Sequence, residues 1–216
     1  MIYEPEKFDG FSGSFLDYFL HEIECVHAKV RRYASPDEYP FTTGLPQPIL
    51  PPLTYPDGVL VQNSINVNYK VKSIYVERIL PALCRHDDGH YGSSATKDVE
   101  VLQLLSRRIH YGKFVAEAKF REQRDEYVRL IQNKDREGLM RLLTNDDVEK
   151  RLLERLRVKA MTYGQELTGG VSDTPAHLRI PVNLVTDMYR DYVIPLTKEV
   201  EVEYLLIRLD SAAKKQ

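Results

Sequence analysis

Two cations on one predicted helix are the first residues whose spacing suggests chemistry. Arg108 and Lys119 stand eleven residues apart in the stretch LSRRIHYGKFVAEAKF. At 3.6 residues per turn, this spacing returns to within about 20° of the same face, roughly 16 Å further along the axis. Gly112, Val115 and Ala116 lie between them on that face and form a shallow trough. A trough flanked by cations favours a pocket for a small anion.

Two later helices each carry a polar pair on a face that otherwise reads as buried. Asn145 and Glu149 lie one turn apart, and so do Thr197 and Glu201. Each has an ordinary alternative. Asn145 sits in a cluster typical of a helix start and is also a good N-cap. Glu201 could be a surface acid paired with a neighbouring cation, and Lys119 could extend along the surface into water.

A pocket built from these side chains would suit only a few kinds of ligand and reaction. Two cations suit a small dicarboxylate, with Arg108 binding one group bidentately and Lys119 placing a point charge. The sequence contains no GxSxG, HExxH or P-loop motif and no paired Cys/His ligand pattern. Without these motifs, a catalytic site could act only by electrostatics and by positioning its substrate. This favours proton transfer or a rearrangement within one bound molecule.

A second cluster combines Arg31 and Arg32, at the end of the first predicted helix, with GHYGSSAT, residues 89–96. A glycine-serine helix start offers backbone N–H groups to an anion, and arginines bind carboxylates. The alternative is a capped helix and a cationic helix C-terminus that the macrodipole favours. The residues alone do not decide between them.

Composition describes an ordinary globular chain of 216 residues with 43% hydrophobic and 29% charged residues. The 30 basic and 32 acidic residues are well mixed, which argues against nucleic acid as a partner. No apolar run approaches the ~20 residues that a membrane span needs. Cys25 and Cys84 lack metal-ligand spacing and read as free thiols in a reducing compartment. These features predict a cytoplasmic protein with no membrane partner.

Hydrophobic periodicity predicts an all-α fold in one domain, residues 1–216, with no significant sheet. Ser14 is the expected N-cap of the first helix, and Ser93 or Ser94 that of a long helix running to Phe120. The expected helices span residues 14–33, 65–83, 93–120, 122–135, 136–144, 145–164, 182–193 and 195–210. Residues 167–181 are an expected loop.

Residues 36–56 hold seven of the 12 prolines, so they cannot form a helix or a central strand. The segment nevertheless contains Phe41, Ile49, Leu50 and Leu53. We therefore expect an ordered, extended strap over the core.

Several long motifs resemble the eukaryotic, all-helical chorismate mutases of fungi and plants. They are RRYASPDEYPF, PILPPLTYP, YGSSATKDVEVLQLLSRRIHYGKFVAEAKF, VEKRLLERLRVKAMTYG and YVIPLTKEVEVEYLLIRLD. The resemblance implies rearrangement of chorismate to prephenate, with no cofactor and no metal. It also implies a homodimer regulated by Tyr or Trp.

The resemblance assigns roles to both clusters. As catalytic residues it implies Arg108, Lys119 and Glu201; as substrate-binding residues it implies Asn145, Glu149 and Thr197. As contacts to an aromatic amino-acid effector it implies Arg31, Arg32, His90, Gly92, Ser93 and Thr96, with His90 in place of the more usual Asn. Glu201 would face the ether oxygen with Lys119, and it assists only when burial keeps it protonated.

The sequence departs from the family pattern in two places. The family has a further N-terminal helix that supplies another arginine, and this sequence begins downstream of it, at MIYEPEKFDGF. Pro181 stands where regulated fungal members often carry Thr or Ser, which places the effector response in question. The alternative function is therefore a catalytically impaired homologue that acts as a regulatory or interaction protein.

Overall fold

Helices make up every regular element in the described part of the chain, which confirms the all-α prediction. The computed structural model describes residue 11 and residues 13–53, 59–84, 89–164 and 181–210. The α-helices are α1 (Phe15–Lys29), α2 (Asn68–Ile74), α3 (Leu80–Leu83), α4 (Tyr91–His110), α5 (Gly112–Glu122), α6 (Arg124–Gln132), α7 (Arg136–Leu143), α8 (Asp146–Tyr163), α9 (Val182–Met188) and α10 (Ile194–Ile207). The 3₁₀-helix η2 (Arg32–Ala34) follows α1, and π-helical turns form η3 (Tyr75–Ile79) and η4 (Tyr189–Val193).

Two of the predicted helix starts have different outcomes. Ser14 caps α1 in a reciprocal capping box with Asp17, as expected. The prediction that Ser93 or Ser94 caps the long helix is wrong, because α4 already begins at Tyr91. The Ser94 amide donates to the carbonyl of His90, and the Ser93 hydroxyl donates to that same carbonyl. Backbone hydrogen bonds therefore start this helix before a serine side chain can cap it.

Prolines account for both π-helical turns. Pro81 and Pro195 lie within the first turn of α3 and α10. Proline cannot donate to the carbonyl four residues earlier, and its ring clashes with that carbonyl. Just before each proline, the chain instead bonds across five residues, from Leu80 to Tyr75 and from Ile194 to Tyr189. Residues 68–83 and 182–207 thus continue as helices past their prolines.

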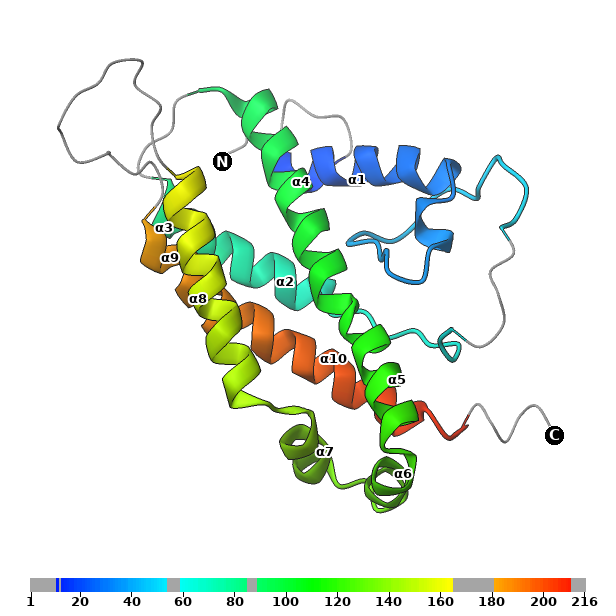
Figure 1. The fold of residues 1–216 in the computed structure, drawn as a ribbon. Helices are drawn as coiled ribbons and strands as arrows, with labels where there is room; N and C mark the ends of the chain where they lie inside the picture. The colour runs from blue at the N-terminus through cyan, green and yellow to red at the C-terminus, as the bar shows by residue number, and fades with distance from the viewer. Residues whose placement is uncertain (1–10, 12, 54–58, 85–88, 165–180, 211–216) are drawn as a thin grey trace, which may run out of the picture.

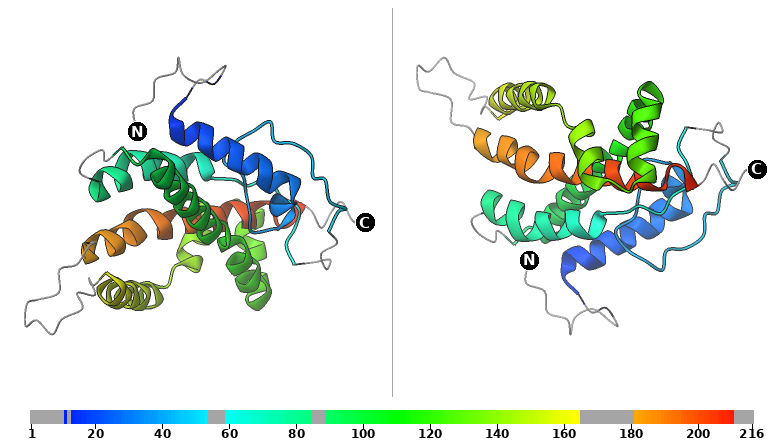
Figure 2. Two further views of the ribbon diagram at one scale, coloured as in Figure 1. Left: turned by 90° about the horizontal axis from the view of Figure 1, so that it is seen from above. Right: turned by 90° about the horizontal axis from the view of Figure 1, so that it is seen from below.

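The arrangement centres on α4 and α5, which follow one another through Tyr111 as a single rod (Figure 1). This rod packs against α1, α2 and α10, while α6 and α7 lie beyond its lower end. α8 packs beside α9, and α1 and α8 lie on opposite sides of the molecule (Figure 2).

α10 joins two hydrophobic clusters. Its first half contributes Leu196 and Val200 to a cluster with α1, α2 and α4. Its second half contributes Val202, Tyr204 and Leu205 to a cluster with α5, α6 and α7. Thr197 and Glu201 are buried polar residues on this same helix. Polar groups are thus held where two apolar clusters meet.

The proline-rich strap is fixed to α1 at two points. Glu24 is fully buried, and its carboxylate accepts the backbone N–H groups of Phe41 (2.7 Å) and Thr42 (2.8 Å). Ile49 donates its N–H to the carbonyl of Lys29. Phe41 packs on the core as expected, but Ile49, Leu50 and Leu53 are exposed. The strap therefore packs on the core at Phe41 and not at the other three side chains.

Gly112 brings α5 and α10 unusually close together. A Cβ atom on this residue would lie 2.9 Å from Thr197 Cγ2, 3.0 Å from the Thr197 carbonyl and 3.1 Å from Glu201 Cγ. The sequence predicted a shallow trough along Gly112, Val115 and Ala116. At Gly112 that prediction is wrong, because α10 fills the space.

We predict that Gly112→Ala destabilises the protein by about 1–3 kcal/mol, because the backbone carbonyl of Thr197 cannot move aside without shifting α10. Gly92→Ala is the matched control, since nothing lies within 4 Å of its added Cβ in α4. The control should be neutral or stabilising by up to about 1 kcal/mol. Urea unfolding of both variants measures the difference, and equal stabilities would contradict the close contact.

Candidate active site

Glu201 is the most perturbed carboxyl group of the candidate site. It is 5% exposed and lies on α10 opposite Gly112. The pKa of Glu201 is raised to about 7, mainly by burial and to a smaller extent by the negative charge of Glu149. The positive charges of Lys119, Lys198 and Arg108 act in the opposite direction. The carboxyl group is therefore poised to be protonated near neutral pH.

The two cations of the long rod both influence this carboxyl group electrostatically. Arg108, on α4, and Lys119, on α5, are both half-buried, and both act on the charge of Glu201. Lys119 Nζ also donates to the carbonyl of Leu143, at 2.6 Å. Leu143 is the last residue of α7, so its carbonyl accepts no backbone hydrogen bond within that helix. An ammonium group has three donors, so Lys119 keeps two for a ligand.

Lys198 is a cation of this cluster that the sequence did not single out as a site residue. Its Nζ lies 2.7 Å from a carboxylate oxygen of Glu149, on α8. Both side chains are largely shielded, at 19% and 27% exposure. The signal was present in the sequence, because Lys198 follows Thr197 and lies three residues from Glu201. Its pairing with Glu149 could not be predicted, since no local pattern links α8 to α10.

Asn145 and Thr197 both hold local roles. Asn145 Oδ1 accepts the N–H of Val148 and caps α8, the ordinary alternative foreseen from the sequence. Its amide nitrogen retains two donors. Thr197 is buried, and its hydroxyl donates to the carbonyl of Val193 at 2.6 Å. That hydroxyl can still accept a hydrogen bond.

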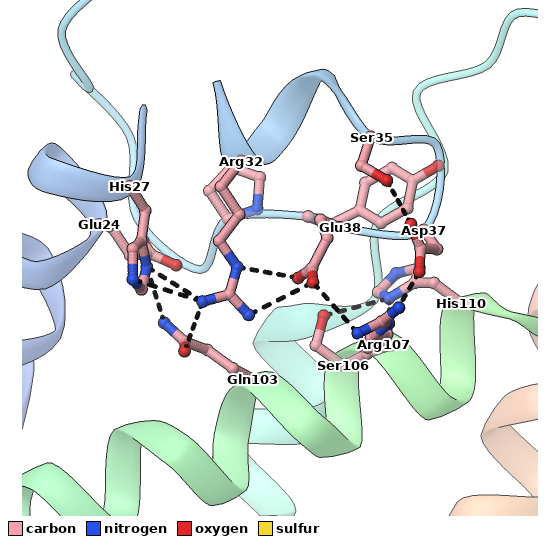
Figure 3. A network of polar contacts seen from close by, with 12 residues as sticks. Glu24, His27, Arg32, Ser35, Asp37, Glu38, Gln103, Ser106, Arg107 and His110 are labelled. Atoms are coloured by element: carbon pink, nitrogen blue, oxygen red, sulfur yellow. Dashed lines mark hydrogen bonds and ion pairs between the residues drawn. The ribbon is translucent and has the colours of Figure 1, made fainter. Parts of the chain in front are cut away.

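The second cluster does not form one site within a single chain. Arg32 pairs with Glu38 at 3.1 Å and donates to the side chain of Gln103 on α4 at 2.9 Å (Figure 3). His27 lies beside the same guanidinium. Arg31 has a left-handed backbone, with φ of 67°, and donates to the carbonyl of Pro51. Both arginines thus have partners along the strap and the middle of α4.

The other members of that cluster lie on the first turns of α4. His90 precedes the helix, while Gly92, Ser93 and Thr96 are exposed. The Thr96 hydroxyl donates to the carbonyl of Gly92. Thr96 and Gln103 are seven residues apart, which is roughly 10 Å along a helix. Arg32 contacts α4 at Gln103 and is therefore well separated from this turn.

Within the described ranges, no group of three His, Cys, Asp or Glu side chains is placed to hold a metal ion. No helix in those same ranges is long and apolar enough to span a bilayer. Cys25 and Cys84 are free thiols, and Cys84 is exposed.

Comparison with known proteins gives consistent matches. Residues 90–202 match the sequence model of the family "chorismate mutase type II". Chloroplastic chorismate mutase 1 of Petunia hybrida is 48% identical over an alignment of 215 residues that covers 96% of this chain and 66% of the relative. Chorismate mutase of Emericella nidulans is 50% identical over an alignment of 206 residues that covers 91% of this chain and 76% of the relative.

Solved structures share the fold. The Aro7p chorismate mutase of Candida albicans, in complex with L-Trp, superposes with a TM-score of 0.86 at 39% identity, covering 97% of this chain and 81% of that one. AtCM1 with tyrosine bound in its allosteric site gives a TM-score of 0.85 at 46% identity, covering 96% and 83%. The chain therefore belongs to the all-helical chorismate mutases of plants and fungi, a family of isomerases.

Proposed function

We propose that this chain catalyses the rearrangement of chorismate to prephenate at the cluster around Glu201. In this reaction an ether C–O bond breaks and a C–C bond forms within one molecule, so no nucleophile is needed. The observation that carries the proposal is a buried carboxyl group on α10, beside Gly112 of α5, whose pKa three cations influence. Such a site stabilises charge that develops on an oxygen in the transition state.

The charges of the cluster support a dianionic substrate. Arg108, Lys119 and Lys198 contribute three positive charges, and ionised Glu149 removes one. With Glu201 protonated, the cluster carries two positive charges, which balance the two carboxylates of chorismate. Ionisation of Glu201 would reduce this to one and would place a carboxylate against the ether oxygen.

The proposed roles follow from the hydrogen-bond donors and acceptors that each side chain can offer to a substrate. Arg108 holds a carboxylate and so favours the compact chair conformer. Lys119 and protonated Glu201 donate to the ether oxygen as it gains negative charge. Asn145, Glu149 and Thr197 contact the rest of the substrate, with Asn145 donating from its amide nitrogen and Glu149 accepting from the substrate hydroxyl.

The pH dependence of activity tests the role of Glu201. Because its pKa is raised to about 7, the protonated form exists below that pH and is lost above it. We predict that kcat falls as pH rises through about 7, and that Glu201→Gln removes this fall, since the amide donates at every pH. The measurement is the disappearance of chorismate in parent and variant from pH 5 to 9.

Glu203→Gln is the matched control, because Glu203 lies on the same helix but pairs with Arg136 near the surface. It should keep the parental profile. A Glu201→Gln profile that still falls through pH 7 would refute the assigned role. Turnover of the parent no faster than uncatalysed rearrangement would refute the activity and favour a regulatory or interaction protein.

We further propose that Tyr or Trp binds as an effector between two copies of the chain. In this arrangement Arg31 and Arg32 of one copy meet the first turn of α4 of the other, at His90, Gly92, Ser93 and Thr96. Two observations support it: these groups are separated within one chain, and relatives have been solved with Trp or Tyr bound. Pro181 directly precedes α9, and an effect of this proline on the response to Tyr or Trp is a prediction. The cytoplasmic location of the protein is likewise a prediction.

Effector binding is measurable by calorimetry, with sedimentation to determine the oligomeric state. We predict a dimer in which Arg32→Gln weakens binding of Tyr and Trp by about tenfold or more, because one charge-assisted bond to a carboxylate is lost. Lys97→Gln is the control, since Lys97 adjoins Thr96 but pairs with Glu100. Equal affinities in the two variants, or full affinity in a monomer, would argue against this site.

A further inference from the structure

Lys113, one residue after Gly112, is a buried cation that the proposed chemistry does not use. Its side chain is fully buried. Nζ donates to Asn63 Oδ1 at 2.8 Å and to the carbonyl of Ile65, and it lies 3.8 Å from the centre of the Tyr39 ring. These partners satisfy the ammonium with neutral groups rather than with a carboxylate. Burial lowers the pKa of Lys113 to about 7, because the charged ammonium group is less stable in this buried position than in water.

The partners of Lys113 lead to α10. The Asn63 side chain donates to the carbonyl of Val61 at 3.0 Å. The N–H of Val61 donates to the Tyr204 hydroxyl on α10, at 3.2 Å. That hydroxyl donates in turn to Glu117 at 2.7 Å, back on α5. Lys113 and Glu117 are one turn apart on α5, so this chain of contacts returns to the helix where it began. We call the five residues Lys113, Asn63, Val61, Tyr204 and Glu117 the circuit.

This circuit lies beside the proposed catalytic pair. Tyr204 is three residues after Glu201 on α10, and Lys119 follows Glu117 by two residues on α5. Tyr204 and Glu117 are therefore each within one turn of a residue proposed to act on the ether oxygen, and Lys113 lies one turn before Glu117. A shift of α5 along α10 would change the spacing between Lys119 and Glu201.

We infer that Lys113 and Tyr204 are positioning residues whose buried circuit sets α5 against α10 and so fixes the spacing between Lys119 and Glu201. The inference rests on the proposed function of those two side chains. Lys113 acts through Asn63 and Val61, and Tyr204 acts through its hydroxyl. Neither touches the substrate.

The test compares Lys113→Met, Tyr204→Phe and the double variant with the parent in chorismate turnover. Both single changes keep the shape of the side chain and delete hydrogen bonds of the circuit. We predict that each lowers kcat roughly tenfold to hundredfold, because small misplacements of catalytic groups are that costly. KM should change by less than about threefold, because Arg108 still binds the carboxylate. Tyr204→Phe removes one oxygen and tests the circuit even where Lys113→Met fails to fold.

Two controls separate positioning from general stability. Tyr75→Phe removes the same oxygen from another buried tyrosine, whose hydroxyl donates to Asp98 on α4 at 2.7 Å and lies outside the circuit; it should lower Tm but leave kcat within about twofold. The double variant should lie within about twofold of the slower single variant, because both changes break one circuit.

The outcomes are distinct. Both single variants keeping parental kcat despite a lower Tm would show a structural role only and overturn the inference. Losses that multiply in the double variant would overturn the shared circuit. An inactive parent would overturn the proposed function itself and this inference with it, and the first assay detects that result.

Discussion

Where α5 and α10 meet, the absence of a side chain on Gly112 lets the helices approach until Thr197 and Glu201 lie against the backbone of α5. This contact removes water from the Glu201 carboxyl group. In a low-dielectric environment, ionisation is penalised, and three nearby cations only partly offset the penalty. The arrangement of the site follows from this balance between desolvation and positive charge.

The fold maintains the balance from several directions. Hydrophobic clusters on both halves of α10 hold it in place. Lys198 holds Glu149 at the edge of the site, and the carbonyl at the end of α7 orients Lys119. Because all these groups are fixed before a ligand binds, little reorganisation remains for the reaction step. This preorganisation takes the place of a nucleophile or metal in the proposed mechanism.

Local patterns in the sequence predicted the helices well, because capping and periodicity act over a few residues. Ser14 and Asn145 mark helix starts as their types suggest. Lys113 was missed, although it shares a stripe with Ile109, Ala116 and Phe120, since a lysine is ordinarily a surface residue. Lys198 was missed because its partner is on a distant helix. The roles given to the site residues came from family resemblance, and they remain predictions about chemistry.

The central claim is that the carboxyl group of Glu201 is protonated near neutral pH, and a carbon-detected NMR titration of glutamate side chains tests it most directly. The Glu201 resonance is assigned by its loss in the Glu201→Gln variant. The predicted midpoint in the free protein is about 7. A midpoint near the ordinary value of 4.5 would contradict the account, because Glu201 would then be ionised at neutral pH and unable to donate to the ether oxygen.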